Sequence, residues 1–185
     1  RGECPVNTAD LTNADFGGKF EAIQPYITPT ALAYINRAER LKELVRAYQA
    51  DDNAGMTVVT TAQPDAAWYE VPVVDNDGSV KQGFITFGPN TINTFPRLID
   101  ALSHELGHYV VENPGAVIAN ARNAAVAAVL GASDAEARRQ GANDYEAACH
   151  LTEGYAVLET ARIIDQMVAN GGLSNSDGSW MLRKH

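Results

Sequence analysis

Two histidines and a glutamate in one short segment have the spacing of a metal site. The segment reads His104-Glu105-Leu106-Gly107-His108. On a helix, residues four apart lie on one face about a turn apart, so both imidazoles can reach one metal ion. The intervening glutamate then lies beside the open coordination position of the metal, and this donor set suits Zn²⁺. The sequence therefore predicts a zinc site; the alternative is two ordinary helical histidines beside a salt-bridging glutamate.

A catalytic zinc has three protein ligands and a water, so a third ligand is needed. The residues after His108 lack the extension that supplies a third histidine in metzincins, which excludes that kind of site. The remaining candidates follow further along the chain in a long helical pattern: Glu146, His150, Glu153 and Glu159. We favour Glu153, because the small residues after it would let its helix approach the histidine-bearing helix closely.

The order of these groups resembles that of the zincin metallopeptidases of the gluzincin branch. In that branch an H-E-x-x-H helix is completed by a glutamate from a downstream helix. Here residues 104–108 are followed, 45 residues after the second histidine, by the segment Glu-Gly-Tyr-Ala at 153–156. The resemblance extends from about Gly83 to Arg162, and the first half of the chain does not share it.

The resemblance implies that His104, His108 and Glu153 bind zinc and that Glu105 is the general base. The expected reaction is hydrolysis of peptide bonds in a protein or peptide substrate. Zinc lowers the pKa of its bound water to about 7, and the base takes the proton of that water and returns it to the leaving amine.

Neutral donors near the zinc would stabilise the oxyanion that forms during hydrolysis. His150 lies three residues before Glu153 on the same predicted helix face, and it is a further ligand, a catalytic helper or a packed neighbour. Tyr155 and Tyr145 are the comparable phenols, with core packing as their alternative. We assign the catalytic helper role to His150 or Tyr155.

The chain departs from the gluzincin pattern at Val157. Many gluzincins carry an acidic residue at this position, four residues after the ligand glutamate, where it supports a histidine. The supporting carboxylate is therefore expected elsewhere, with Asp100, Asp144 and Asp165 as candidates, or a backbone carbonyl takes its place.

The helices and strands expected around these residues predict an α+β fold in a single domain over residues 1–185, and the resemblance implies that this fold is zincin-like. Residues 1–53 are expected to form an irregular wrap and an amphipathic helix from Thr30. Residues 54–93 are expected to form a small, mostly antiparallel sheet, and residues 94–185 a helical part that holds the metal site.

Within the sheet we expect a meander of three strands at 56–62, 68–74 and 79–87. Pro72 lacks a backbone donor, so the middle strand should be an edge or be interrupted there. The aromatic pair Trp68 and Tyr69 is expected in the core. In zincins the strand before the metal helix is the edge along which an extended peptide lies, so the resemblance implies strand addition at residues 83–87.

The helical part is expected to begin at Asn93 or Thr94 with a helix that carries the metal motif and stops at Pro114. A second helix is predicted at 116–130, a short one from Ser133, and a long one at 144–170. After that helix the tail is polar until Trp180, Met181 and Leu182, which are expected to dock on the domain.

Composition excludes several function classes. The 185 residues carry 14 Lys and Arg against 23 Asp and Glu, a formal net charge of -9, which argues against nucleic acid as the partner. The 45% hydrophobic content suffices for a sizeable core, and no apolar run is long enough to span a membrane. The two cysteines, Cys4 and Cys149, are expected either to form a disulfide or to remain free thiols.

The chain begins with Arg1, so a processed or excised segment is expected, and with it a secreted protein. Its organisation resembles the metallopeptidase modules of bacterial secreted effectors and polymorphic toxins, which implies an immunity or inhibitor protein as a partner. Three alternatives remain open at this point. They are a secreted or housekeeping peptidase without a toxin role, a binding module in which zinc only staples the helices, and an amidase acting on a non-protein amide such as peptidoglycan.

Overall fold

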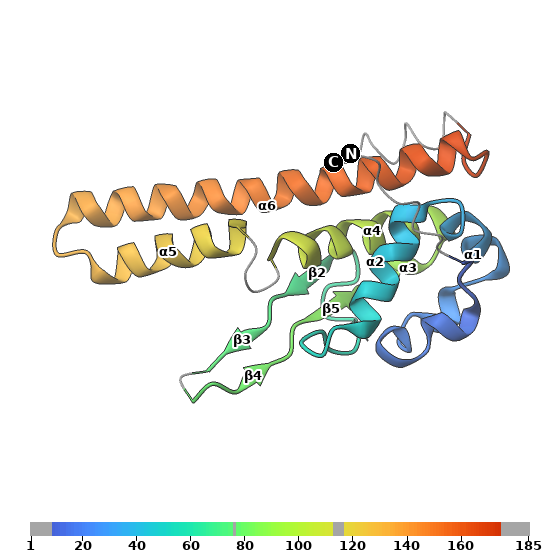
Figure 1. Ribbon diagram of the computed structural model, residues 1–185, viewed down its shortest axis with the longest axis horizontal. Helices are drawn as coiled ribbons and strands as arrows, with labels where there is room; N and C mark the ends of the chain where they lie inside the picture. The colour runs from blue at the N-terminus through green and yellow to red at the C-terminus, as the bar shows by residue number, and fades with distance from the viewer. Residues whose placement is uncertain (1–8, 76, 113–116, 175–185) are drawn as a thin grey trace.

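Helix α6 (Ala135–Ala169) runs along the whole molecule, as Figure 1 shows. At the rise of an α-helix its length is about 52 Å. The side chain of Asp134 begins the helix by accepting a hydrogen bond from the backbone N–H of Ala137 at 2.8 Å. The sequence predicted two separate helices here; the structure has one, because Gly141 does not break it but packs closely against Val129 of a neighbouring helix.

The computed structural model describes residues 9–75, 77–112 and 117–174. In these residues six α-helices and two small sheets form an α+β fold, which confirms the predicted class. The N-terminal wrap contains three 3₁₀ helices, at Asn13–Phe16, Gly18–Phe20 and Gln24–Tyr26. No helix in the described ranges combines the length and the apolar character needed to cross a membrane.

Two expectations concern residues beyond those ranges. The possible disulfide involves Cys4, and the docking of the tail involves Trp180, Met181 and Leu182, all of which lie outside the described residues.

The single helix predicted from Thr30 is in fact two helices, α1 (Pro29–Ile35) and α2 (Glu39–Ala50). The break is held by Asn36, whose side-chain oxygen accepts the backbone N–H of Leu11 at 2.7 Å. The amide nitrogen of the same side chain donates to the carbonyl of Leu11 at 2.9 Å. The N-terminal wrap therefore stabilises the break by hydrogen bonding at the residue where α1 ends.

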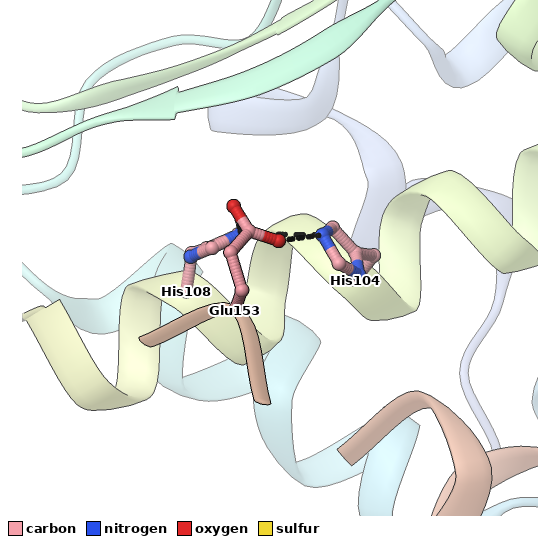
Figure 2. Close-up of side chains that lie close together, drawn as sticks. All are labelled: His104, His108 and Glu153. Carbon is pink, nitrogen blue, oxygen red and sulfur yellow. Dashed lines mark hydrogen bonds and ion pairs between the residues drawn. The ribbon is translucent and has the colours of Figure 1, made fainter. Parts of the chain in front are cut away.

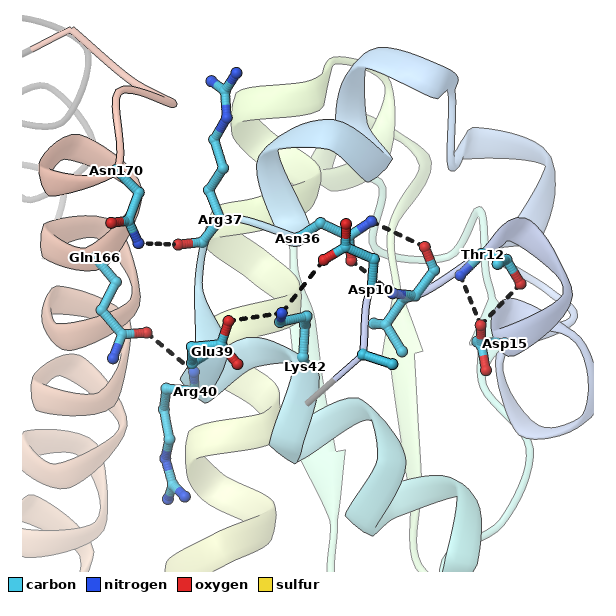
Figure 3. A network of polar contacts seen from close by, with 12 residues as sticks. Asp10, Thr12, Asp15, Asn36, Arg37, Glu39, Arg40, Lys42, Gln166 and Asn170 are labelled. Atoms are coloured by element: carbon cyan, nitrogen blue, oxygen red, sulfur yellow. Dashed lines mark hydrogen bonds and ion pairs between the residues drawn. The ribbon is translucent and has the colours of Figure 1, made fainter. Parts of the chain in front are cut away.

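Helix α6 contacts the same break from the other side (Figure 3). Gln166 accepts the backbone N–H of Arg40 at 3.0 Å, and Asn170 donates to the carbonyl of Arg37 at 2.7 Å. The Arg40 guanidinium also forms an ion pair with Glu159 at 2.7 Å. These contacts fix the C-terminal half of α6 against α2 and the break that precedes it.

The three-stranded sheet has the order β1 (Val58–Val59), β5 (Phe84–Phe87), β2 (Ala67–Glu70). Strand β5 pairs parallel with β1 and antiparallel with β2, so the predicted meander is wrong in its strand order. The reason is burial. Ile85 and Phe87 are fully buried, and the central position gives this most buried strand a hydrogen-bonding partner on both edges.

A two-stranded ribbon extends from this sheet (Figure 1). Strands β3 (Val73–Val74) and β4 (Val80–Lys81) pair antiparallel, which confirms the predicted hairpin. Pro72 lies between β2 and β3, as expected for a residue that cannot donate to a ladder. Strand β2 is also an edge strand of its sheet, so both consequences predicted for Pro72 are confirmed.

The metal motif lies inside α4 (Phe95–Glu112), which follows the short helix α3 (Pro89–Ile92). The predicted apolar stripe of α4 is buried, including Leu98, Leu102 and Leu106. This stripe faces the core and fixes the rotation of the helix, so the opposite flank presents the motif.

Helices α4 and α6 pack closely against each other at Gly107. A Cβ atom placed on Gly107 would lie 2.8 Å from the Cα of Ala156, which no real side chain tolerates. Ala156 is one of the small residues after Glu153 that suggested such an approach. Gly154 is the other small residue. A Cβ atom placed on it would have no atom within 4 Å, so it takes no part in the contact.

Helix α5 (Val117–Gly131) completes the fold by packing along the N-terminal half of α6. Figure 1 shows the two as a helical hairpin that extends away from the sheet and the N-terminal helices. Glu153 therefore lies near the middle of α6, between the half that packs on α5 and the half that packs on the N-terminal helices.

The contact at Gly107 generates the first prediction. Gly107→Ala should lower the free energy of unfolding by about 1–3 kcal/mol, because the added methyl group forces α4 and α6 apart. The matched change Gly154→Ala has open space around it and should raise stability by up to about 1 kcal/mol through helix propensity. Urea denaturation of both variants is the measurement, and equal effects of the two changes would contradict the packing described here.

Candidate metal centre

His104, His108 and Glu153 meet at the contact of α4 with α6 (Figure 2). The two histidine Nε2 atoms are 3.2 Å apart. One carboxylate oxygen of Glu153 lies 3.5 Å from Nε2 of His104, and the other lies 3.5 Å from Nε2 of His108. The three residues predicted to be ligands therefore present their donor atoms to one another.

These distances fit a metal ion. Tetrahedral ligands at zinc–ligand distances of about 2.0–2.1 Å place their donor atoms about 3.4 Å apart. The two Nε2 atoms, 3.2 Å apart, lie close to this value. Each of them is 3.5 Å from a different oxygen of Glu153, and with one donor atom per residue all three lie within 4.8 Å of one another. Two imidazole lone pairs that face each other also repel unless a proton or a cation lies between them. The donor set and its spacing are thus suited to a small divalent cation.

The chain matches no protein-family model, no curated protein and no solved structure. The zincin-like fold accordingly stays a prediction, and the chemistry of the site is argued from its own residues.

The donor group opens into a cleft of about 730 Å³. Helix α4 provides its floor, strand β2 one wall, and the helical hairpin the other wall. The lining residues are Ala67, Trp68, Tyr69, Glu70, Val71, Val73, His104, Glu105, His108, Glu112, Arg122 and Glu153. A cleft of this size beside the three donor residues has room for a short stretch of an extended chain.

The strand beside this cleft is not the one that the sequence indicated. Residues 83–87 were expected to form the open sheet edge, but β5 is central and both of its edges are paired. That prediction is wrong, because β1 covers the edge that a simple meander would have left free. The edge strand at the cleft is β2, whose residues 67–70 line it.

Glu105 is buried at the base of the cleft. One of its carboxylate oxygens is inaccessible and forms no hydrogen bond with any described residue. Burial raises the pKa of this carboxyl to about 8; His108 opposes the shift, whereas Glu153 and Glu112 add to it. A nearby divalent cation would favour its charged form instead. A buried, unpaired carboxylate beside a donor group is what the predicted general base requires.

A carboxylate contacts His108 from Glu112, one turn further along α4. Its Oε1 lies 3.2 Å from Nδ1 of His108, and its Oε2 accepts a 2.9 Å hydrogen bond from Arg122 of α5. Burial alone would raise the pKa of Glu112, but these two hydrogen bonds lower it below its usual value. The same contact raises the pKa of His108 against the effect of burial.

None of the three aspartates predicted for this role lines the cleft. Asp100 is buried on α4 one turn before His104, so its supporting role stays a prediction. Asp144 accepts a hydrogen bond from Gln140 at 2.8 Å, and Asp165 lies exposed near the end of α6. The prediction missed Glu112 because it considered only aspartates and a backbone carbonyl. The signal was present, since residues four apart on a helix face each other.

The structure does not bring His150 or Tyr155 to the donor group. The side chain of His150 is 77% exposed, and its Nε2 lies 3.6 Å from Glu146 on the outer surface of α6. Tyr155 and Tyr145 are also largely exposed, and neither lines the cleft. Tyr155 is two residues from Glu153, which places it on the far side of the helix.

The other two glutamates considered as ligands are occupied elsewhere. Glu146 pairs with His150, and Glu159 forms ion pairs with Arg40 at 2.7 Å and Arg162 at 3.2 Å. Of the four candidates for the third ligand, Glu153 alone lies with the two histidines in the described part of the chain.

Trp68 and Tyr69 both line the cleft, and Tyr69 also packs against the hydrophobic core, as the sequence predicted. Trp68 is half-buried and donates to Glu70 at 3.0 Å. The hydroxyl group of Tyr69 is buried, so this residue presents its ring and not its hydroxyl to the cleft.

The second prediction concerns metal binding. Wild-type protein should bind about one zinc ion per chain, and Glu153→Ala should bind it at least about tenfold more weakly because one of three protein ligands is lost. The matched change His150→Ala, on the same helix, should leave the affinity unchanged. Competition with a chromophoric chelator measures all three affinities. Loss of zinc in His150→Ala with retention in Glu153→Ala would contradict the assignment.

Proposed function

We propose that this protein is a zinc-dependent metallopeptidase that hydrolyses peptide bonds in the cleft between β2 and α6. The observation that carries the proposal is the combination of three donors, from His104, His108 and Glu153, with the buried carboxylate of Glu105 in one cleft. Three protein donors leave a fourth position for water, whereas a structural zinc site has four.

The exposure of His150 supports a catalytic rather than a stapling role for the metal. A closed site would need a fourth protein ligand, and His150 is the residue on α6 best placed by sequence to supply one. Its imidazole instead faces solvent beside Glu146. The donor group is also partly open, since the side chain of Glu153 is 62% exposed.

A bound zinc ion would activate a water molecule and polarise the carbonyl of the scissile bond. His104, His108 and Glu153 would hold it. Glu105 accepts the proton of the water and returns it to the leaving nitrogen, which its position in the cleft and its lack of a hydrogen-bonding partner permit. Next to a divalent cation its charged form is favoured, as this first proton transfer requires.

The remaining residues of the cleft orient the substrate. Strand β2 is an edge strand among the described residues and its residues line the cleft, so an extended peptide can hydrogen-bond to its backbone. Arg122 is the one cationic side chain among the described lining residues.

The third prediction tests the general base. Glu105→Gln should bind zinc as wild type does but lower kcat/KM for an unstructured protein substrate by about 10²–10⁴-fold, because proton transfer is lost. The exposed Glu21, far from the cleft in the N-terminal wrap, provides the matched control, and Glu21→Gln should keep full activity. Zinc content and fluorogenic peptide hydrolysis are measured on the same preparations.

Three other outcomes would each reject the proposal. Undiminished hydrolysis by Glu105→Gln would exclude this glutamate as the base. Cleavage of peptidoglycan amides without cleavage of any protein would favour the amidase. A tightly bound zinc ion without hydrolysis of either substrate would favour the stapled binding module.

A further inference from the structure

A chain of hydrogen bonds connects helix α5 with the metal donors. Arg122 of α5 donates to Oε2 of Glu112 at 2.9 Å, and Oε1 of Glu112 lies 3.2 Å from Nδ1 of His108. The other ring nitrogen of His108 faces His104 and Glu153. The side chains in this series of hydrogen bonds are well buried, with 18% of Arg122 and 10% each of Glu112 and His108 exposed.

Each carboxylate oxygen of Glu112 has its own partner. Oε1 holds the Nδ1–H of His108, which fixes the tautomer that leaves the lone pair of Nε2 free for a cation. Oε2 holds the guanidinium of Arg122, which sets the rotation of the carboxylate. Without the arginine, a largely buried negative charge would lose its only described cationic partner and turn toward solvent.

We propose that Arg122 is a positioning residue of the metal centre that acts through Glu112 on His108. The inference rests on the metal site of the proposed function but does not depend on the substrate. It gives the helical hairpin a role at the site: α6 contributes Glu153 directly, and α5 contributes Arg122 through Glu112. Both helices of the hairpin in Figure 1 therefore hold the metal centre.

A second role for Arg122 would give different results. This residue also lines an adjoining cavity of about 320 Å³, together with Val71, Pro72, Val73 and Asn123. If its main contact were with substrate, removing it would raise KM and leave the metal affinity unchanged. A positioning role predicts the reverse, because the metal affinity then depends on Arg122 even when no substrate is present.

The experiment compares zinc affinity in Arg122→Ala, Glu112→Ala and the double variant by chelator competition, without substrate. Glu112→Ala should weaken zinc binding by about 10–100-fold, as for other residues that orient metal ligands. Arg122→Ala should weaken it by about tenfold. Because Arg122 acts through Glu112, the double variant should bind zinc as Glu112→Ala does. Arg122→Lys, which keeps the charge but loses the planar fork, should restore part of the affinity.

The ion pair of Arg40 with Glu159 is the matched control. It joins α2 to α6 at 2.7 Å with similar burial, but it lies away from the donor group. Arg40→Ala should lower the melting temperature while leaving the zinc affinity within about twofold of wild type. The absorption spectrum of the Co²⁺-loaded protein provides a second readout, which should change in Arg122→Ala and not in Arg40→Ala, because the spectrum reports ligand geometry.

Each result has one meaning. Wild-type zinc affinity and an unchanged Co²⁺ spectrum in Arg122→Ala would overturn the positioning role and leave the proposed function intact. Additive losses in the double variant would also overturn it, since Arg122 would then act independently of Glu112. Failure of the wild-type protein to bind zinc would reject the metal site itself, and the proposed function with it.

Discussion

The close packing of α4 on α6 at Gly107 is the contact on which the candidate site depends. Glu153 approaches the histidines only because the two backbones come within reach of each other at Gly107 and Ala156. The rest of the fold maintains this contact. The break between α1 and α2 binds the C-terminal half of α6, and α5 supports its N-terminal half. A long helix held at both ends can place one carboxylate over a neighbouring helix with little freedom.

The site combines this rigid contact with an unusual concentration of buried charge. Glu105 and Glu112 lie on one helix within reach of the same histidine, yet their environments push their pKa values in opposite directions. Burial raises the pKa of Glu105, one oxygen of which has no hydrogen bond to any described residue, whereas hydrogen bonds with His108 and Arg122 lower the pKa of Glu112. Two carboxyl groups of one type thereby differ as the two roles that we propose for them require, proton transfer for Glu105 and support of a ligand for Glu112.

The part of the site that follows helical periodicity could be predicted from the sequence, and the part set by tertiary contacts could not. His104, His108 and Glu153 were found because spacing on one helix and small residues on another are local signals. The strand order was missed because pairing of β1 with β5 leaves no local trace, and the position of His150 depends on the rotation of a helix 35 residues long. The zincin-like fold, secretion, and a toxin role with its immunity protein stay predictions.

The central claim is that His104, His108 and Glu153 hold one zinc ion with a water in the fourth position. A crystal structure of the zinc-loaded protein, with anomalous diffraction recorded at the zinc edge, tests it most directly. The account predicts a single anomalous peak with two imidazole nitrogens, one carboxylate oxygen and one water at about 2.0–2.2 Å. A zinc ion closed by four protein ligands, or bound without Glu153, would contradict it.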